Sequence, residues 1–95
     1  TRLVRLLYRG KNRARVEEAA GEFCSYLRRD LPQSAELLGP SEAPLAVISG
    51  NHRIHAILRG DSLKELYGLL NHFLERLPPP SGVYREVDSD PVNLL

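Results

Sequence analysis

The chain contains one cysteine, no methionine and no tryptophan, and only two of its 13 basic residues are lysines. A single cysteine, Cys24, excludes an internal disulfide and favours a reducing compartment. No apolar run approaches the roughly 18 residues that a membrane-spanning helix requires. A strand pattern begins at residue 2 without a signal-peptide segment before it. We therefore expect a cytoplasmic protein with no membrane partner.

The composition that remains is that of one ordinary globular domain. Ninety-five residues leave no room for two independent cores, and 42% hydrophobic with 26% charged residues is typical of a folded protein. A net charge of +1 excludes a strongly basic nucleic-acid arm. Eleven of the basic residues are arginine, which pairs with carboxylate or phosphate in a bidentate manner better than lysine does.

Apolar periodicity predicts four strands and two helices. Alternation marks the strands, stripes at spacings of three and four mark the helices, and Pro32 and the triproline at 78–80 end them. Asn12 is a predicted N-cap, and Ser62 with Glu65 forms a capping box. In order, the elements are a strand at 2–9, a helix from Asn12 to Leu31, a strand at 34–39 and 45–49 broken by a loop from Pro40 to Pro44, a strand at 52–59 after a Gly50-Asn51 turn, a helix from Ser62 to about Leu77, and a strand at 83–88.

This order predicts an α+β, ferredoxin-like β-α-β-β-α-β sandwich. Right-handed crossovers place both helices on one face of a mostly antiparallel sheet. Strands 2–9 and 52–59 should be central neighbours, and the other face of the sheet should have no helix over it.

That open face is the predicted binding site. Alternation gathers arginine and histidine side chains there, with Leu3, Leu7 and Ile57 between them. They are Arg5, Arg9, Arg53, His55 and Arg59. Such a face suits a nucleic-acid backbone or an acidic peptide with hydrophobic side chains. Two other interpretations are docking on the rest of a larger protein and simple solvation. Tyr8, the only aromatic residue of the first strand, should face the core, unlike the stacking residues of RNA-reading sheets.

No group of residues indicates catalysis, and we expect no metal or cofactor in this chain. His52 and His55 lie three apart on a strand, so they point to opposite faces. Cys24 has no paired base, and a buried thiol on a helix is the simpler interpretation. Asp88 and Asp90 share a face but have no third ligand, so we interpret them as capping the end of the strand. Gly10 and Lys11 are not part of a phosphate-binding loop.

Five segments, taken in order, resemble the C-terminal domain of the PriA family of primosomal replication-restart helicases. Residues 3–10 resemble its opening strand, which ends at a basic residue and glycine. Residues 38–45 resemble its Leu-Gly-Pro-x-x-Ala-Pro loop, and residues 50–55 its Gly-Arg-aromatic-Arg strand, with Asn51-His52 in place of the basic-aromatic pair. Residues 61–62 open the second helix, and residues 87–91 resemble its terminal Asp-x-Asp-Pro signature, which a short apolar tail follows.

The resemblance implies that residues 1–95 are a single C-terminal accessory domain of a larger bacterial, nucleoid-associated helicase. Such a parent is an ATP-dependent 3′–5′ DNA helicase that binds ATP and zinc outside these residues. The domain itself would be non-catalytic, would bind forked or single-stranded DNA and single-stranded DNA-binding protein, and would pack on the upstream helicase lobes. Arg53 matches a family strand position. The alternatives are a purely structural bracing module and a small-ligand regulatory domain of ACT type, which shares this element order.

Overall fold

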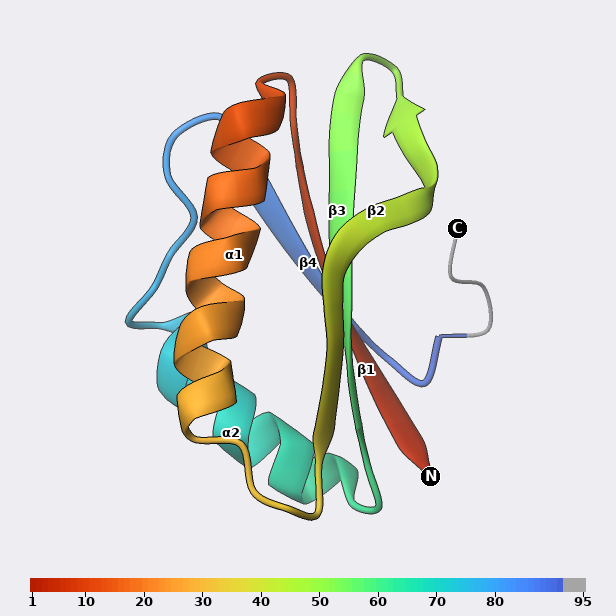
Figure 1. The fold of residues 1–95 in the computed structure, drawn as a ribbon, viewed down its shortest axis with the longest axis vertical. Coiled ribbons are helices and arrows are strands. Elements are labelled where there is room, and N and C mark those ends of the chain that lie inside the picture. The colour runs from red at the N-terminus through yellow and green to blue at the C-terminus, as the bar shows by residue number, and fades with distance from the viewer. Residues whose placement is uncertain (92–95) are drawn as a thin grey trace.

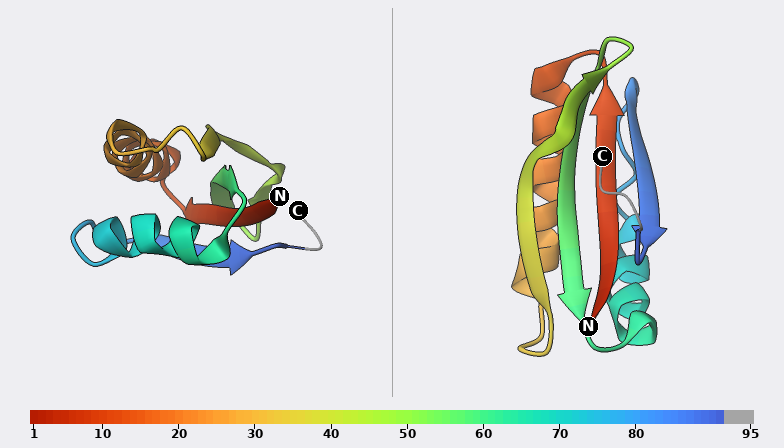
Figure 2. Two further views of the ribbon diagram at one scale, coloured as in Figure 1. Left: turned by 90° about the horizontal axis from the view of Figure 1, so that it is seen from below. Right: turned by 90° about the vertical axis from the view of Figure 1, so that its right-hand side faces the viewer.

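The computed structural model describes residues 1–91 as two layers, a sheet and a pair of helices on one of its faces (Figures 1 and 2). The elements are β1 (Arg2–Gly10), α1 (Arg13–Arg29), β2 (Glu36–Ile48), β3 (Asn51–Gly60), α2 (Leu63–Leu74) and β4 (Val83–Ser89). The apolar tail that follows the Asp-x-Asp-Pro signature lies outside the described residues. Within residues 1–91, no helix is long and apolar enough to cross a membrane.

The sheet has the order β2-β3-β1-β4, and every pair of neighbours is antiparallel. The predicted ferredoxin-like α+β fold is confirmed, with β1 and β3 in the centre. Figure 2 shows the face of the sheet opposite the helices, with the four strands side by side.

The core fills the space between the helices and the sheet. Tyr8 lies on this inner side, as predicted, and Phe23 of α1 packs near it and near Phe73 of α2. The most deeply buried side chains come from both layers: Phe23, Leu6, Leu27, Leu58, Leu70, Val4, Val16 and Cys24. Apart from Cys24, these side chains lie at positions of the predicted helix stripes or on the inner side of the predicted strand alternation, because both kinds of apolar surface are removed from water between the two layers.

The predicted break in the second strand is wrong: β2 is one strand of 13 residues. Its pairing with β3 shifts register between Leu38 and Ser41 and again between Glu42 and Val47. Pro40 lacks an N–H to donate, but β2 is an edge strand, where such a gap in the ladder is tolerated. From outside the sheet, Arg28 of α1 donates from Nη2 to the Gly39 carbonyl at 2.6 Å.

The β2–β3 turn and both helix ends differ from the prediction by a few residues. The turn residues are Ser49 and Gly50, with φ of 51° and 79°, and β3 starts at Asn51. Positive φ at both positions is what a two-residue hairpin of type I′ requires. Helix α1 ends at Arg29 and α2 at Leu74, while Glu75 keeps helical φ and ψ and the Leu77 amide donates to the Phe73 carbonyl at 2.8 Å. Leu31 and Leu77, each directly before a proline, are disfavoured in the helical region.

Candidate functional site

The five predicted site residues lie on one face of the sheet, the face without helices. Arg5 and Arg9 belong to β1, while Arg53, His55 and Arg59 belong to β3. The antiparallel register places Arg9 opposite Arg53, Leu7 opposite His55, and Leu3 opposite Arg59. Because directly opposite residues in a ladder share a face, all of these side chains project from the same side. We call this surface the open face.

The open face also carries carboxylates: Glu36 and Glu86, which the sequence analysis did not consider, and Asp88, which it interpreted as a cap of the strand end. Arg9 Nε donates to Glu86 Oε2 at 2.9 Å, and Arg5 Nη2 lies 3.5 Å from Asp88 Oδ2. At the other edge of the sheet, Arg59 pairs with Glu36 of β2. These acids come from the two edge strands, where their own alternation places them on one face. Which arginine each acid meets depends on the register of these strands with β1 and β3.

The arginines of the open face differ in depth. Arg5 and Arg53 are only 6% and 7% exposed. Arg53 Nη1 donates to the Leu45 carbonyl at 2.8 Å, which ties it to the irregular half of β2; Figure 1 shows that half bending away from the helices. The side chains of Arg9 and Arg59 retain 38% and 46% exposure. Of the four, Arg9 and Arg59 are therefore the ones that an incoming ligand can reach most easily.

His55 lies between these arginines and is half-buried. Burial lowers the pKa of His55 below its usual 6.5, and the positive charges of Arg5 and Arg53 lower it further. Its Nδ1 is buried and has no hydrogen-bond partner within residues 1–91. At neutral pH the side chain is therefore an uncharged member of the open face.

Tyr84 gives the open face an exposed aromatic ring that the sequence analysis did not place there. It lies opposite Arg9 in the β1–β4 ladder and is 55% exposed. The Arg9 guanidinium carbon lies 4.8 Å from the centre of the ring. The signal in the sequence was the alternation of Val83 and Val87 with Tyr84 and Glu86, since the valines mark the core side.

Of the other candidates of the sequence analysis, Asp90 has clear structural partners. Asp90 Oδ1 accepts from the Leu3 amide at 2.8 Å and its Oδ2 pairs with Arg2, which confirms that it caps the sheet. The hydrogen bond from Arg2, and then that from Leu3, lowers the pKa of the Asp90 carboxyl. Burial raises the pKa of Cys24 to about 11. Residues 1–91 contain no group of three His, Cys, Asp or Glu side chains that could hold a metal ion.

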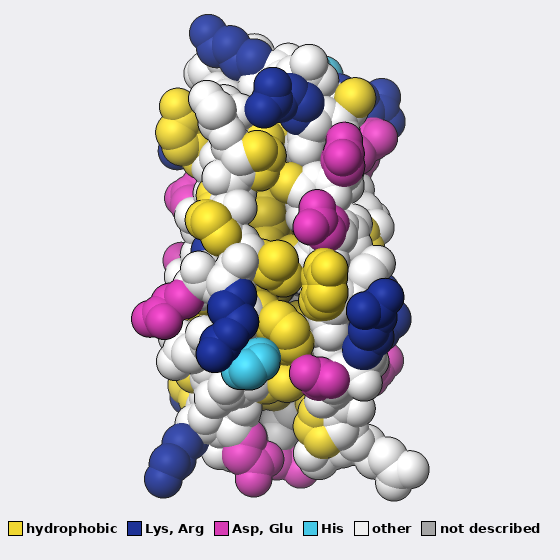
Figure 3. Space-filling view, turned by 90° about the vertical axis from the view of Figure 1, so that its left-hand side faces the viewer, with side chains coloured by type: hydrophobic (Ala, Val, Ile, Leu, Met, Phe, Trp, Pro, Cys, Tyr) yellow, Lys and Arg dark blue, Asp and Glu magenta, His cyan; other side chains and the backbone are white. Residues whose placement is uncertain are grey.

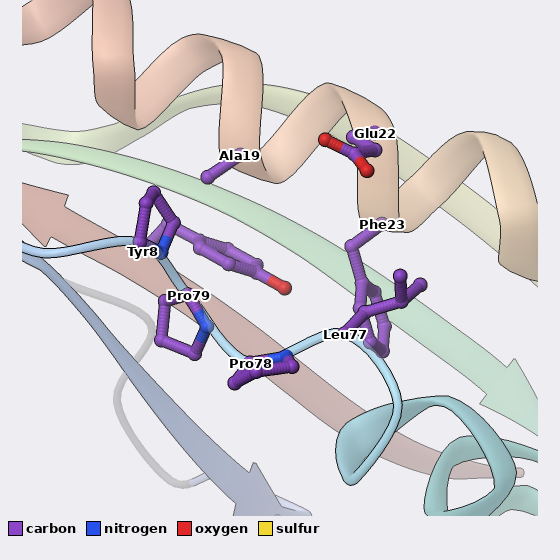
Figure 4. Close-up of a pocket in the computed structure, with 8 residues that line it drawn as sticks. Tyr8, Ala19, Glu22, Phe23, Leu77, Pro78 and Pro79 are labelled. Carbon is purple, nitrogen blue, oxygen red and sulfur yellow. The ribbon is translucent and has the colours of Figure 1, made fainter.

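The helix side offers a small cavity between α1 and the triproline segment. Figure 4 shows the Tyr8 ring reaching between α1 and Pro79, with Phe23 and Leu77 further along. The volume is about 50 Å³, enough for one or two water molecules and too small for a metabolite. Burial raises the pKa of Tyr8 to about 12, although the neighbouring Arg85 acts in the opposite direction. Beyond this cavity, Figure 3 shows a narrow apolar seam along the helix side, flanked by charged side chains.

Comparison with known proteins relates nearly the whole chain to one family. Residues 1–92 match the family described as the primosomal protein N C-terminal domain. The replication restart protein PriA of Treponema pallidum (strain Nichols) is 35% identical over 94 residues, and that of Borreliella burgdorferi is 33% identical over 94 residues. Each alignment covers 99% of this chain and 14% of the relative.

A solved structure shares the fold without close sequence similarity. The de novo designed protein Foldit4 superposes with a TM-score of 0.67 at 15% identity, covering 97% of this chain and 98% of its own. At that identity the likeness concerns the fold alone, since one fold hosts many functions.

Proposed function

Because the chain belongs to the family of primosomal protein N C-terminal domains, we propose that it is the accessory domain of a replication-restart helicase and binds forked or single-stranded DNA on its open face. Its curated relatives are named replication restart proteins, and the chain spans 14% of their length. In this proposal the chain is non-catalytic and works in the cytoplasm at the nucleoid. ATP hydrolysis and zinc binding belong to the parent outside these residues.

The observation that carries the proposal is the accessible pair Arg9 and Arg59 at opposite ends of the open face. Both are paired with carboxylates, so a phosphate must replace Glu86 or Glu36. An exposed ion pair contributes about 0–1 kcal/mol, which makes this exchange inexpensive. Each phosphate neutralised on DNA also releases counterions, which favours binding at low salt. The buried Arg5 and Arg53 shape the face in this proposal and need not touch DNA.

Two further partners are proposed, one for the open face and one for the exposed part of β2. An acidic peptide tail with a hydrophobic end fits a face on which arginines surround Leu7 and Ile57. We therefore include the tail of single-stranded DNA-binding protein among the partners. Packing on the upstream helicase lobes is proposed for the exposed apolar side chains of β2. These are Leu38, Leu45, Val47 and Ile48, each at least 43% exposed.

Fluorescence anisotropy with labelled forked DNA at several salt concentrations tests the proposal. The Arg9→Ala/Arg59→Ala variant should bind more weakly, and the log–log salt slope should fall by about 1.4 if both residues contact single-stranded phosphates. The matched control is Arg29→Ala/Lys64→Ala, which removes the same charge from the helix side. An absence of binding at low salt, or equal losses in both variants, would contradict the proposal.

A bracing module is the second candidate, favoured by the exposed apolar side chains of β2. If β2 only packs on the helicase lobes, the chain should ignore DNA at every salt concentration and associate with itself or with the lobes. Leu45→Asn should then weaken that association. Because this substitution leaves the net charge unchanged, any DNA binding should stay as in the unsubstituted chain.

A further inference from the structure

A second surface adjoins the open face where β1 enters α1 and β4 begins. Its lining residues come from the β1–α1 connection, the first turn of α1, the start of β3 and the segment that leads into β4, and they border an open hollow of about 430 Å³, a volume typical of small-ligand sites. The residues that matter here are Lys11, Asn12 and Arg15 at the start of α1, Asn51 at the start of β3, and Ser81 and Tyr84 around β4. We call this surface the Tyr84 pocket.

The charges of the Tyr84 pocket are not compensated as those of the open face are. Lys11 and Arg15 are exposed, and neither forms an ion pair within residues 1–91. None of the residues that line the pocket is acidic. By contrast, Arg9 and Arg59 each have a carboxylate partner. Figure 3 shows basic side chains at the end of the molecule where α1 begins. An anionic ligand therefore meets no carboxylate in the lining of this pocket, although Arg15 also lines a neighbouring hollow with Glu18 and Glu22.

The Tyr84 ring supplies a stacking surface beside these cations. The guanidinium of Arg9 lies 4.8 Å from the ring centre, and more than half of Tyr84 is still exposed. A base stacks on an aromatic ring whatever its identity, and a nearby arginine adds cation–π attraction. The Asn51 amide nitrogen donates to the Ile48 and Ser49 carbonyls, so the Asn51 amide oxygen and the Ser81 hydroxyl are the groups that can bond to base edges.

From these features we infer that the Tyr84 pocket binds one nucleotide unit of single-stranded DNA. The base stacks on Tyr84, and the adjoining phosphate lies between Lys11 and Arg15. This inference rests on the proposed function, and it locates the single-strand contact at the end of the sheet. An acidic peptide offers charge to the cations but no base to the ring, so the two ligands differ in what they require of Tyr84.

The test compares a labelled oligothymidylate of about 15 nucleotides, the size that small single-strand binders cover, with an abasic strand of equal length. The parent chain should prefer the strand that has bases. Tyr84→Ala should weaken oligothymidylate binding about five-fold or more and remove that preference, whereas Tyr84→Phe should keep it. Tyr26→Ala is the matched control, because Tyr26 is also exposed beside an arginine but lies on α1. Equal binding of oligothymidylate and the abasic strand by the unsubstituted chain would overturn the inference.

Two further measurements separate the parts of the inference. The chain has no tryptophan, so Tyr84→Trp adds a unique fluorophore that unlabelled oligothymidylate should quench and the abasic strand should not. Lys11→Ala/Arg15→Ala should reduce the log–log salt slope by about 0.7, because one phosphate lies between the two side chains. Unchanged Trp fluorescence, or an unchanged slope, counts against the pocket.

The outcomes also distinguish the pocket from the open face. No DNA binding by the parent chain at low salt removes both proposals. If Arg59→Ala weakens binding and Tyr84→Ala does not, the open face stands and the pocket fails. If Tyr84→Ala weakens binding and Arg59→Ala does not, the pocket stands alone. Displacement of the strand by an acidic peptide, with no preference for bases, makes the pocket a peptide site and overturns the inference.

Discussion

At the scale of single residues, arginine has two roles in this molecule. Arg28, Arg53 and Arg85 donate to backbone carbonyls of neighbouring segments and hold those segments in place. Arg9 and Arg59 pair with exposed carboxylates that a ligand can replace. The first role should appear in stability measurements, and the second in binding measurements.

His55 should make the stability of the chain depend on pH. Its folded pKa lies below 6.5, so the unfolded state binds more protons between the two pKa values. The free energy of unfolding therefore rises with pH through this window. The contribution of His55 is fully present above about pH 6.5 and is lost as the pH falls from there through the folded pKa. The groups around His55 are Arg5 and Arg53, with Leu7 and Ser41 opposite it in the ladders.

Urea unfolding at several pH values between about 5 and 7.5 measures this effect. His55→Gln should flatten the dependence in that range. His72→Gln, which changes an exposed histidine of α2, should leave it as in the parent because His55 is retained. An equal free energy of unfolding of the unsubstituted chain at both ends of the pH range would contradict the account of His55.

Cys24 should be unreactive toward thiol reagents in the folded protein. It is 1% exposed, and burial raises its pKa to about 11, so at pH 8 the thiolate that reacts with a disulfide reagent is scarce. We expect labelling by a thiol reagent to be slow in buffer and fast in denaturant. Rapid stoichiometric labelling of the native chain would show that α1 does not pack as described.

At the scale of elements, Arg85 joins β4 to the end of α2. Nη1 donates to the Leu77 carbonyl at 2.7 Å and Nη2 to the Leu74 carbonyl at 2.9 Å. Hydrogen bonds from a charged group stabilise by about 1.5–3 kcal/mol. Arg85→Met, which keeps the aliphatic bulk, should therefore cost about 2 kcal/mol of unfolding free energy.

Arg76→Met is the control for Arg85. Arg76 also donates to a carbonyl of α2, that of His72 at 2.6 Å, but it does so on the exposed surface. Loss of this hydrogen bond should lower the free energy of unfolding by less than about 1 kcal/mol. Chemical denaturation of the two variants gives the comparison, and equal costs would contradict the structural role of Arg85.

The sequence predicts the elements well because their signals are local. The alternation of β1 and the stripe from Val16 to Leu27 depend only on neighbours a few residues apart. The pairing of Arg9 with Glu86 cannot be predicted in this way, because it joins residues 77 positions apart. Register between β1 and β4 decides it, and no local pattern fixes that register. The alternation with Val83 and Val87 indicates the face of Tyr84, but its neighbour Arg9 could be identified only after β4 had been paired with β1.

The course of β2 shows a second kind of limit. Gly39, Pro40 and Pro44 are signals for a turn or loop, and they predicted a break. The strand continues because its other edge faces no neighbour, so two irregular steps cost few hydrogen bonds. Edge position is a property of the sheet and is not encoded next to the prolines.

At the scale of the whole molecule, charge compensation sets the kind of binding to expect. The net charge is +1, and the accessible arginines of the open face are paired. Long-range attraction to DNA is therefore weak, and contacts must form by local exchange of carboxylate for phosphate. The account predicts weak, salt-sensitive, sequence-independent binding, as suits a domain that assists a larger protein.

The most direct test of the central claim is to remove the competing carboxylates. Glu36→Gln/Glu86→Gln frees Arg59 and Arg9 without changing the shape of the side chains. Affinity for labelled forked DNA, measured by anisotropy at several salt concentrations, should increase relative to the parent chain and should fall in Arg9→Ala/Arg59→Ala. If the glutamine variant binds no more tightly than the parent at low salt, the open face does not bind DNA through these arginines.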